Sequence, residues 1–545
     1  MAAHDARHGP VPGEAGDSVP DARRTGQAVT PEQAGQQDVF ALLQDPATHG
    51  LSAPVKRIDT HGAAVFLAGP DVYKVKRAVR FPFLDFSTLQ KRHAACLAEI
   101  EVNRHNAPGL YLGVTPVTRR AGALHLGGSG PAVEWAVHLR RFDEAATLDR
   151  LAEQGPLGPG VVDTLAQVVA AAHRRAAHRD GAAATRNLRG VLEGTAADVA
   201  SSPVLFPPQA AAALSHALNT AFARAEPLLL RRGGRGLVRH CHGDLHLGNI
   251  AMVGGAPVLF DAIEFDAALA TTDVLYDLAF LLMDLCKRGL VADANRLLNR
   301  YLPYLDPSFD DELAGIGGLA ALPLFMGLRA AIRAKVAAAL LRLDPLTPHL
   351  RDDALECLDA AAGFLAPAPP VLVAVGGLSG TGKTTLAAAL APVLGRAPGA
   401  LHLRSDVERK RLFGVPATAR LPQDAYRPEV AAQVQTRLHA LAAAALGAGQ
   451  AVILDATHRR PTDRAAAAAQ AALAGVPFVG LWLEAPAGMT AQRIAGRRGD
   501  ASDATAAVAA AQAAQAVGAL DWHRLDAGQP VGALECAARR HLEAP

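Results

Sequence analysis

Hydrophobic and polar positions change their spacing along the chain, and the change divides it into regions. Between residues 50 and 145, short apolar runs predict strands, and one longer stretch, Ser87–Asn106, has the period of a helix. The predicted strands are Val55–Asp59, Ala63–Leu67, Asp71–Lys76 and Ala132–Phe142. From residue 147 to 365 the helical period dominates. The pattern therefore predicts a small β-rich lobe followed by a larger, mostly helical one.

The last third of the chain has a different pattern. Residues 366–370 form a stiff, proline-rich segment, and we predict a linker there. Beyond it, apolar strand segments alternate with helical ones, which is typical of a parallel sheet flanked by helices. The predicted strands are Val371–Val375, Ala400–Leu403, Ala451–Leu454 and Phe478–Leu483. The sequence as a whole predicts a multidomain protein of the α/β and α+β classes.

Length and composition agree with several packed domains. The chain has 545 residues, of which 50% are hydrophobic and 19% charged, and its formal net charge is +2. Such a chain is too long for one hydrophobic core, and its composition supports packed globular domains. The near-neutral charge gives no general attraction to nucleic acid or to anionic membranes. Residues 1–36 are rich in Gly, Pro and charge without periodicity, and we predict a disordered tail there.

The sequence favours a cytoplasmic location. Its five cysteines are dispersed without metal-ligand spacing, which fits a reducing compartment. The N-terminus has no apolar segment of the secretory type. The closest approach to a membrane span, Leu275–Leu285, contains Asp277 and Asp284 and is too short. Nucleotide and small-molecule partners are therefore expected, and a membrane is not.

The most informative motif follows the first strand of the last third. Residues 377–384 read GLSGTGKT and fit the phosphate-binding pattern GxxxxGK[ST]. Glycines let such a loop turn back and point backbone N–H groups at phosphate oxygens, and a helix N-terminus adds partial positive charge. Lys383 is expected to bridge the β- and γ-phosphates of ATP, and Thr384 to ligate Mg²⁺. The predicted ATP-binding loop residues are Gly377, Leu378, Ser379, Gly380, Thr381, Gly382, Lys383, Thr384 and Thr385.

Further candidates surround this loop. Asp455 ends an apolar strand, as the acid of a Walker B motif does, and is expected to hold Mg²⁺. Asp406 follows another strand, and two interpretations stay open: a catalytic base for an acceptor hydroxyl, or the N-cap of the next helix. Arg493 and Arg497 are four residues apart on one face of a predicted helix and would grip phosphate, with a solvated basic face as the alternative. Thr457–Arg460 is a further candidate for substrate or phosphate contact.

These motifs, over about residues 370–530, resemble the small P-loop kinases that include gluconate kinases, chloramphenicol phosphotransferases and zeta toxins. The resemblance implies ATP-dependent phosphorylation of a hydroxyl rather than mechanical ATP hydrolysis. The segment is also short for a ring-forming motor ATPase, although its P-loop is of the kind that AAA family ATPases carry.

A second motif lies in a polar turn in the middle of the chain. Residues 242–249 read HGDLHLGN, and after a short strand the residues LFD end at Asp261. This pattern resembles the aminoglycoside phosphotransferase and choline kinase family, which has the two-lobed fold of protein kinases. The resemblance implies that Asp244 is the catalytic base and that Asn249 and Asp261 bind Mg²⁺.

Neighbouring residues of this turn have other expected roles. His240, His242 and His246 offer a zinc site as an alternative, but an accessible turn without cysteine spacing is poor for zinc, so we expect the histidines to shape the loop. Asp277 is expected to brace the catalytic loop rather than to touch substrate.

A kinase of this type also needs a strand lysine for the phosphates and a helical glutamate to position it. The segment Asp71–Lys76 offers Lys74 and, two residues on and so on the same face, Lys76. We predict Lys74 with Glu99 for ATP binding, with Lys76 and Glu101 as the alternatives. A pair of solvated strand lysines is a third interpretation. No GxGxxG loop precedes the lysine, which departs from the protein-kinase pattern.

From about residue 40 to 540, the order of motifs resembles a bacterial family of fused proteins that join an aminoglycoside-phosphotransferase-type domain to a P-loop kinase-like domain. The phrases DVYKVKR, HGDLHLGNI, LFDAIEFD, GLSGTGKTT and LDATHRRP carry this match. We accordingly expect a kinase-like domain over 37–365, with lobes 37–145 and 146–365, the linker 366–370, and a P-loop domain over 371–545.

Two functional hypotheses follow. In the first, the chain is a phosphotransferase with two kinase modules that use ATP and Mg²⁺ to phosphorylate hydroxyls of small molecules. In the second, it is a regulatory ATP- or GTP-binding protein in which one module is a sensor. An enzyme acting on nucleic acid ends is disfavoured by the near-neutral charge and by the lack of alternating aromatic and basic residues. None of the motifs specifies an acceptor.

Overall fold

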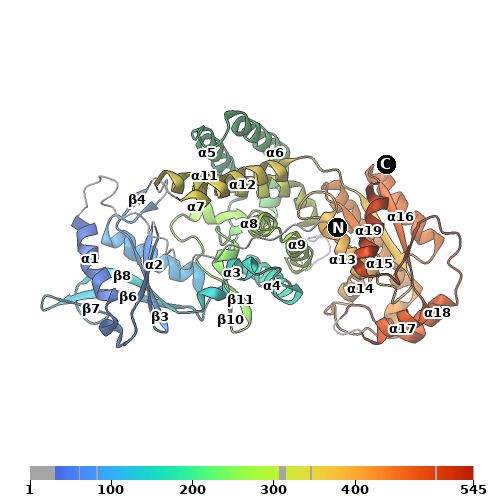
Figure 1. The fold of residues 1–545 in the computed structure, drawn as a ribbon, viewed down its shortest axis with the longest axis horizontal. Coiled ribbons are helices and arrows are strands. Elements are labelled where there is room, and N and C mark those ends of the chain that lie inside the picture. Colours follow the sequence, from blue (N-terminus) through green and yellow to red (C-terminus); the bar gives the residue numbers. More distant parts are fainter. Residues whose placement is uncertain are drawn as a thin grey trace, which may run out of the picture.

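The protein folds into three regions that lie in a row along its longest axis (Figure 1): a small β-rich lobe, a helical lobe in the middle and a parallel α/β region at the other end. The computed structural model describes residues 31–60, 62–81, 84–305, 313, 315–343, 347–496 and 500–543. Residues 1–30 of the predicted tail, and Arg497, lie outside these ranges.

The small lobe is built on a six-stranded antiparallel sheet in the order β1-β2-β3-β8-β6-β7. Helix α2 (Leu89–Arg104) packs against this sheet and starts at Thr88, whose hydroxyl accepts the N–H of Lys91 (3.3 Å). The predicted strands and helix of this region are all present, and β4, β5, β6 and β7 are additional. The strands are β1 (Lys56–Asp59), β2 (Ala63–Ala68), β3 (Asp71–Lys76), β6 (Tyr111–Arg120), β7 (Ala123–Leu126) and β8 (Ala132–Arg140), with a separate pair, β4 (Arg80–Phe81) and β5 (Leu84–Asp85).

The first helix begins earlier than the sequence predicted. Helix α1 (Pro31–Gln44) starts inside the segment that we assigned to a disordered tail. Gln36 explains the order: its buried amide donates to the carbonyl of Lys76 (2.8 Å) and to Glu134 Oε2 (2.7 Å), and it accepts the N–H of Ala78 (2.8 Å). The tail boundary at residue 36 was therefore placed too late.

Helices dominate the large lobe, around the buried α8 (Val274–Lys287). This helix starts at Asp273, which accepts the N–H of Leu275 (2.8 Å) and forms a buried ion pair with Arg232 (2.7 Å). Two antiparallel strand pairs flank the HGDLHLGN turn: β9 (Val238–His240) with β12 (Thr271–Asp273), and β10 (Ile250–Val253) with β11 (Ala256–Leu259). The other helices are α3 (Leu148–Glu153), α4 (Pro159–Arg175), α5 (Gly181–Ala200), α6 (Pro208–Gly234), α7 (Ala267–Ala270), α9 (Val291–Leu305), α11 (Leu322–Leu343) and α12 (Pro348–Leu365).

One apolar segment of the described chain, Gly315–Arg342, is long and apolar enough to cross a membrane by length and composition. In the folded protein 78% of its apolar window is buried, as in the core helix of a soluble protein, so it is weak evidence for a span. The expectation that Leu275–Leu285 comes closest to a span was therefore wrong. The charged Arg329 inside this segment is accommodated because its guanidinium lies 4.0 Å from the ring centre of Tyr276.

The third region is a five-stranded sheet in the order β14-β15-β13-β16-β17, with all neighbours parallel. The predicted parallel sheet flanked by helices is confirmed, and β17 is a strand that the sequence did not predict. The strands are β13 (Leu372–Gly377), β14 (Leu401–Arg404), β15 (Val452–Asp455), β16 (Phe478–Glu484) and β17 (His523–Asp526). The helices are α13 (Lys383–Leu390), α14 (Ser405–Leu412), α15 (Pro428–Gly447), α16 (Pro461–Ala474), α17 (Ala487–Ala495), α18 (Ala506–Ala513) and α19 (Val531–Glu543). Short 3-10 turns complete the chain: η2 (Pro46–His49), η3 (Glu144–Ala146), η4 (Leu247–Asn249), η5 (Gly318–Ala321), η6 (Ala391–Val393) and η7 (Gln423–Tyr426).

Helix α9 of the large lobe binds the outer edge of this sheet. The amides of Asn295 (3.0 Å) and Asn299 (3.2 Å) donate to the carbonyl of Ala400, just before β14. The Oδ1 of Asn299 accepts the N–H of His402 in β14 (2.8 Å). Buried apolar residues of the large lobe and of the sheet, such as Leu297 and Leu401, also belong to one continuous core. The two regions are thus joined by polar contacts and by a shared hydrophobic core.

Candidate active sites

The GLSGTGKT segment lies between β13 and α13, and close backbone contacts explain two of its glycines. A Cβ on Gly377 would lie 2.7 Å from the carbonyl oxygen of Leu483, and one on Gly380 would lie 2.8 Å from that of Thr490. Both glycines also have positive φ, +139° and +87°, which other residues rarely adopt. The loop can therefore take this path only with glycine at these positions.

The structure brings Thr384 and Asp455 together at the end of this loop. The Thr384 hydroxyl donates to Asp455 Oδ2 (2.7 Å), and Lys383 Nζ donates to the carbonyl of Leu378 (2.9 Å). Burial opposes ionisation of Asp455, but a hydrogen bond to His402 (3.1 Å) and the charges of Arg404 and Lys383 outweigh it and lower the pKa of Asp455 below its usual range. An ionised carboxylate beside a hydroxyl is a donor set of hard oxygens that fits Mg²⁺.

A cavity of about 1150 Å³ opens over the carboxyl ends of the strands and is lined by the loop residues 379–385. The strand order divides it. On one side of β13 lie the segments that follow β15 and β14, with Asp455 and Asp406; on the other side lie those that follow β16 and β17. The latter side is lined by Ala527, Pro530 and Val531, an apolar surface suited to a nucleotide base.

Asp406 lines the cavity but does not cap a helix. Helix α14 already starts at Ser405, with Arg404 at the N-cap and no side-chain cap bond, so Asp406 lies in the first turn. Withdrawal from water raises the pKa of Asp406, which a hydrogen bond with Ser502 partly offsets. The N-cap interpretation is therefore wrong, whereas the role as a base stays a prediction.

Arg493 touches the loop from α17. Its Nη1 donates to the carbonyl of Thr381 (3.2 Å) and its Nη2 to that of Ala527 (2.9 Å). The side chain thus connects the phosphate-binding loop to the segment after β17. Helix α17 ends at Ala495, and Arg497 lies outside the described residues, so the predicted pair of arginines on one helix face stays a prediction.

In the N-terminal region, Lys74 lies between two carboxylates from distant elements. Its Nζ is 3.0 Å from Glu99 Oε1 on α2 and 2.6 Å from Asp261 Oδ1 after β11. Burial would lower the pKa of Lys74, but Asp261 and Glu99 raise it well above its usual value. Lys76 lies beside the same glutamate, 2.5 Å from Glu99 Oε2, and also pairs with Glu264.

These contacts exclude one of the three interpretations of the lysines on this strand. The side chain of Lys76 is only 3% exposed, so the interpretation of two solvated lysines is wrong. Glu101 is exposed, whereas Glu99 is buried and faces both lysines. Lys74 also contacts Asp261, whereas Lys76 contacts Glu264 in the protein interior. The choice of Lys74 for the nucleotide stays a prediction.

The HGDLHLGN turn holds Asp244 and Asn249 against each other. The Asn249 amide nitrogen donates to the backbone carbonyl and to Oδ2 of Asp244, both at 3.0 Å, which leaves the amide oxygen as an acceptor for a metal ion. Burial would raise the pKa of Asp244, but His246 (3.4 Å) and other positive groups lower it, so the carboxylate stays ionised. Asp261 has φ +60° and donates its N–H to the Tyr111 hydroxyl (3.0 Å), a strained backbone held from the small lobe.

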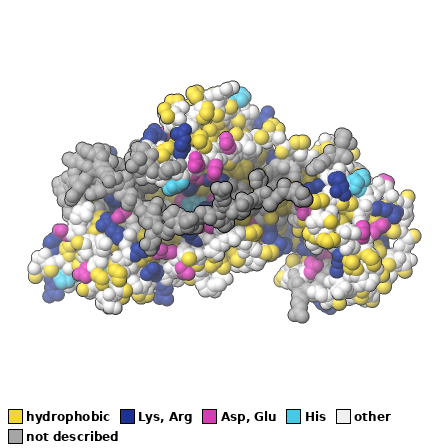
Figure 2. Space-filling view, viewed as in Figure 1, with side chains coloured by type: hydrophobic (Ala, Val, Ile, Leu, Met, Phe, Trp, Pro, Cys, Tyr) yellow, Lys and Arg dark blue, Asp and Glu magenta, His cyan; other side chains and the backbone are white. Residues whose placement is uncertain are grey.

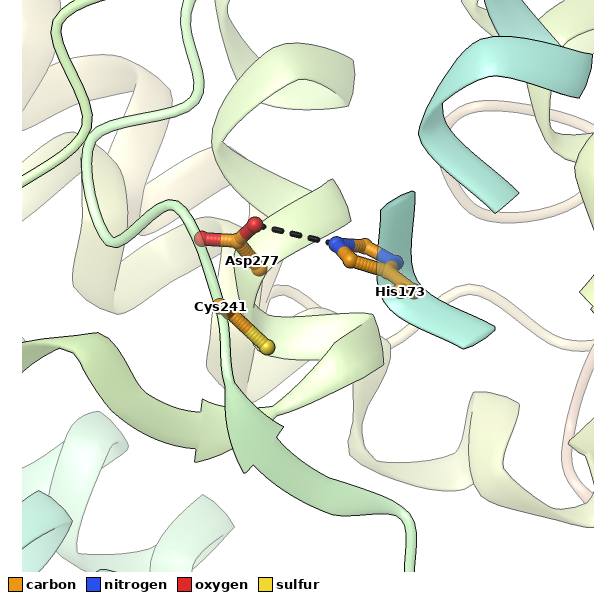
Figure 3. A group of neighbouring side chains, drawn as sticks. All are labelled: His173, Cys241 and Asp277. Atoms are coloured by element: carbon orange, nitrogen blue, oxygen red, sulfur yellow. Dashed lines mark hydrogen bonds and ion pairs between the residues drawn. The ribbon is translucent and has the colours of Figure 1, made fainter. Parts of the chain in front are cut away.

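Asp277, in α8, braces the backbone at the start of the HGDLHLGN turn, as the sequence predicted. It accepts the N–H groups of Gly243 (2.8 Å) and His242 (3.3 Å), and lies 3.0 Å from His173 Nε2 (Figure 3). His173 Nδ1 lies 2.7 Å from the hydroxyl of Tyr301 on α9. The HGDLHLGN turn is therefore anchored through α8 and α4 to α9.

No convergence of His240, His242 and His246 on one point occurs in the described part of the chain, so the zinc alternative has no support there. A different trio, His173, Cys241 and Asp277, brings its ligand atoms within 4.8 Å of one another (Figure 3). Burial raises the pKa of the Cys241 thiol well above its usual value, and backbone N–H groups occupy both oxygens of Asp277. This trio is therefore a brace and not a metal centre.

Sequence reasoning missed several residues around the two sites. His402 contacts Asp455, and Arg404, two residues further along β14, lies 3.7 Å from the same carboxylate. Two polar residues at alternate positions of a strand were a signal, because they share one face. Tyr111 and Glu264 carried no such signal, since only the tertiary fold brings them to Asp261 and Lys76.

Comparisons with known proteins match both regions. The family model described as an AAA domain matches residues 372–518. Over 494 residues the chain is 33% identical to the uncharacterized protein Rv2004c of Mycobacterium tuberculosis, across 87% of this chain and 92% of that protein. The uncharacterized protein Mb2027c of Mycobacterium bovis matches to the same extent.

The chain belongs to the family of these mycobacterial proteins. In this family member, the predicted combination of a two-lobed kinase-like region with a P-loop domain is confirmed by the strand orders and by the domain match.

Solved structures with partial similarity carry the names of kinases or phosphotransferases. A sugar kinase from Janibacter is 24% identical and covers 32% of this chain and 95% of its own, with a TM-score of 0.24. A choline/ethanolamine kinase family protein from Mesorhizobium loti is 14% identical and covers 61% of this chain and 95% of its own, with a TM-score of 0.36. An aminoglycoside phosphotransferase from Alicyclobacillus acidocaldarius is 16% identical and covers 57% and 90%, with a TM-score of 0.32. With scores this low, the assignment rests on the strand orders and the family match.

Proposed function

We propose that this chain is a cytoplasmic, ATP- and Mg²⁺-dependent phosphotransferase with two kinase modules, each of which phosphorylates a hydroxyl of a small molecule. The observation that carries the proposal is that Thr384, Asp455 and Asp406 line one cavity beside the phosphate-binding loop. The Thr384 hydroxyl oxygen and Asp455 Oδ2, the two candidate ligands of Mg²⁺, lie 2.7 Å apart. The formal net charge of +2 supports a small acceptor rather than nucleic acid, and basic and acidic side chains are interspersed on the described part of the face drawn in Figure 2.

In the P-loop module, backbone N–H groups and Lys383 hold the triphosphate, and Thr384 and Asp455 hold Mg²⁺, which would neutralise charge on the phosphates. Asp406 accepts the proton of the acceptor hydroxyl, and the hydroxyl oxygen bonds to the γ-phosphorus. The bond from that phosphorus to the oxygen shared with the β-phosphate breaks, and ADP leaves with that electron pair. Arg493, tied to the loop, stabilises the charge on the transferring group.

In the kinase-like module, Lys74 holds the phosphates and Glu99 holds Lys74. Asn249 and Asp261 are the oxygen donors for Mg²⁺, and Asp244 takes the proton of a second acceptor hydroxyl. The ionised state of Asp244, which follows from its lowered pKa, supports this role because only the carboxylate can take up a proton.

Two point variants of the full chain separate the modules. Purified protein is incubated with labelled ATP, Mg²⁺ and an extract of small metabolites, and the products are compared for the wild type, Lys383→Ala and Asp244→Ala. Each variant is expected to lose a distinct phosphorylated product by about 10³-fold or more, because each removes a group that acts only in one module. Lys56→Ala, an exposed lysine paired with Glu144, is the matched control and keeps all products.

The outcome distinguishes an enzyme from a regulator. If the wild type binds Mg·ATP at both modules but one variant loses no product, the module that it disables is a sensor. If neither variant loses a product, the phosphotransferase proposal is wrong.

A further inference from the structure

The segment that follows β15 has an unusual backbone. His458 has φ +45°, a conformation that residues other than glycine rarely adopt. The residue is buried, and burial lowers the pKa of its imidazole to about 4, so it is neutral. Strain of this kind persists only where the surroundings enforce it, and it is concentrated at functional sites.

The surroundings enforce it through three successive carbonyls. The N–H of Gly377 donates to the carbonyl of Thr457 (3.2 Å). The buried guanidinium of Arg464 donates from Nη1 to the carbonyls of His458 and Arg459, both at 3.0 Å. Because all three carbonyls accept hydrogen bonds, the backbone of residues 457–459 is fixed. The direction in which the side chain of Arg459 leaves the backbone is therefore fixed as well.

Arg464 is itself held rigidly. Its Nη2 donates to the carbonyls of Val517 (2.9 Å) and Ala519 (2.5 Å), so one buried arginine joins the β15 loop to the segment before β17. Among the described residues, Arg464 has no acid partner: it donates to backbone carbonyls and lies over the ring of Trp482 (5.9 Å to the ring centre). A buried cation without an acid partner is a costly way to fix a loop. The cost suggests that the direction of the Arg459 side chain matters.

Arg459 is half-buried and lines the cavity. Within the described part of the chain its guanidinium has no hydrogen bond, ion pair or ring contact. The other arginines of the cavity wall differ: Arg404 pairs with Asp500 (2.8 Å), Arg409 donates to Ala425 (2.8 Å), and Arg493 donates to backbone carbonyls. Only the exposed Arg460, next to Arg459, shares its lack of partners among the described residues.

The strand order puts Arg459 on the acceptor side. It follows β15, between the loop strand β13 and β14, so it lies in the same half of the cavity as Asp406. Asp463 also lines this half, but no ion pair joins it to Arg459. A guanidinium without an acid partner among the described residues, in the same half of the cavity as the group that would take the acceptor's proton, suits a ligand with a phosphate or carboxylate group.

We propose that Arg459 binds an anionic group of the acceptor, so that the P-loop module phosphorylates a hydroxyl compound that already carries a phosphate or a carboxylate. This inference rests on the proposed function. Arg464 is a positioning residue in it, because it acts through the backbone of Arg459. A phosphate-bearing acceptor would be supplied by an earlier phosphorylation, and a carboxylate-bearing one by oxidation of an aldehyde or by hydrolysis of a lactone.

A binding experiment tests the anion site without knowledge of the acceptor. The full chain is loaded with Mg²⁺ and a non-hydrolysable ATP analogue, which fills the phosphate-binding loop. Inorganic phosphate and, separately, acetate are then titrated calorimetrically into the wild type, Arg459→Gln, Arg459→Lys and the control Arg524→Gln, an exposed arginine paired with Glu484.

The wild type and Arg524→Gln are expected to bind one of the two anions saturably. Arg459→Gln is expected to bind it roughly ten-fold more weakly, and Arg459→Lys to keep part of the affinity, because it keeps the charge without the planar fork. The anion that binds more tightly identifies the acidic group. Equal affinity in the wild type and Arg459→Gln, or no binding to either, overturns the inference.

A turnover experiment separates this inference from the proposed function. The product that Lys383→Ala fails to make is identified, and its acceptor is expected to carry a phosphate or carboxylate. In Arg459→Gln the KM for that acceptor should rise roughly ten-fold, with the KM for ATP unchanged. A neutral acceptor overturns the inference but leaves the kinase proposal intact. A loss of kcat at unchanged acceptor KM assigns Arg459 to the transferring phosphate and also overturns it.

Discussion

The two modules hold the lysines that we propose for phosphate binding in opposite ways. Lys383 contacts the carbonyl of Leu378, five residues away, in a loop that its own glycines shape. Lys74 is held by Glu99, 25 residues away, and by Asp261, 187 residues away. One site is therefore made by local backbone and the other by tertiary ion pairs. The second should depend far more on the stability of the whole N-terminal region.

The largest expected effect tests that dependence at Lys76. Lys76→Ala removes a buried cation between Glu99 and Glu264 and leaves two buried carboxylates without it. The free energy of unfolding of the kinase-like region should fall by about 3–5 kcal/mol, as measured by urea unfolding.

Lys74→Ala should cost less stability, because its partner Asp261 has a side chain 43% exposed to solvent. It should nevertheless abolish phosphotransfer by this module. Lys91→Ala, at an exposed pair with Asp85, is the control and should change stability by less than about 1 kcal/mol. A larger stability loss for Lys74→Ala than for Lys76→Ala would contradict the comparison.

The next effect sharpens the comparison in the P-loop module. Asp406→Asn should lower turnover by this module by about 10²-fold while leaving Mg·ATP affinity unchanged, because the residue serves the acceptor and not the nucleotide. The matched control is Asp424→Asn, an exposed aspartate paired with Arg427. A parallel loss of nucleotide affinity, measured by calorimetry, would remove Asp406 from the acceptor side.

The same variant has a predicted pH signature. The pKa of Asp406 is raised in the folded protein, so folding favours its protonated form and the ionised form opposes folding at neutral pH. Asp406→Asn should therefore raise the melting temperature at neutral pH, and the gain should vanish as the pH falls below the usual aspartate pKa of about 4. A melting temperature that falls at neutral pH would show that the carboxylate is stabilising.

These contrasts explain what could be predicted from sequence. The P-loop and the alternation of strands and helices depend on neighbouring residues, so the loop between β13 and α13 and the strand that ends at Asp455 occur where the sequence predicted them. The different surroundings of Lys74 and Lys76 depend on Asp261 and Glu264, which come close only in the folded chain. The contacts of Arg464 with the segments after β15 and before β17 could not be predicted either. Its partners are backbone carbonyls, which every residue has, so no residue type in the sequence indicates them.

The smallest expected effect concerns the contact between helix α9 of the kinase-like module and strand β14 of the P-loop module. Asn299→Ala removes the acceptor of the His402 N–H and should cost about 1–2 kcal/mol, seen as faster hydrogen exchange in β14. The control is Asn219→Ala, whose exposed amide donates to the carbonyl of Ser215 one helical turn away; it should have no measurable effect. Unchanged exchange in β14 would show that helix α9 does not secure the strand.

Helix α9 also has a consequence for how this protein can be divided. Because β14 is the outermost strand of its sheet, its free backbone groups would offer a template for pairing with other chains if nothing covered them. Asn295 and Asn299 of α9, in the other module, occupy two of these backbone groups, the carbonyl of Ala400 and the N–H of His402. A P-loop fragment produced by itself would expose this edge and would tend to aggregate there. The P-loop module therefore depends on the neighbouring module to cover β14.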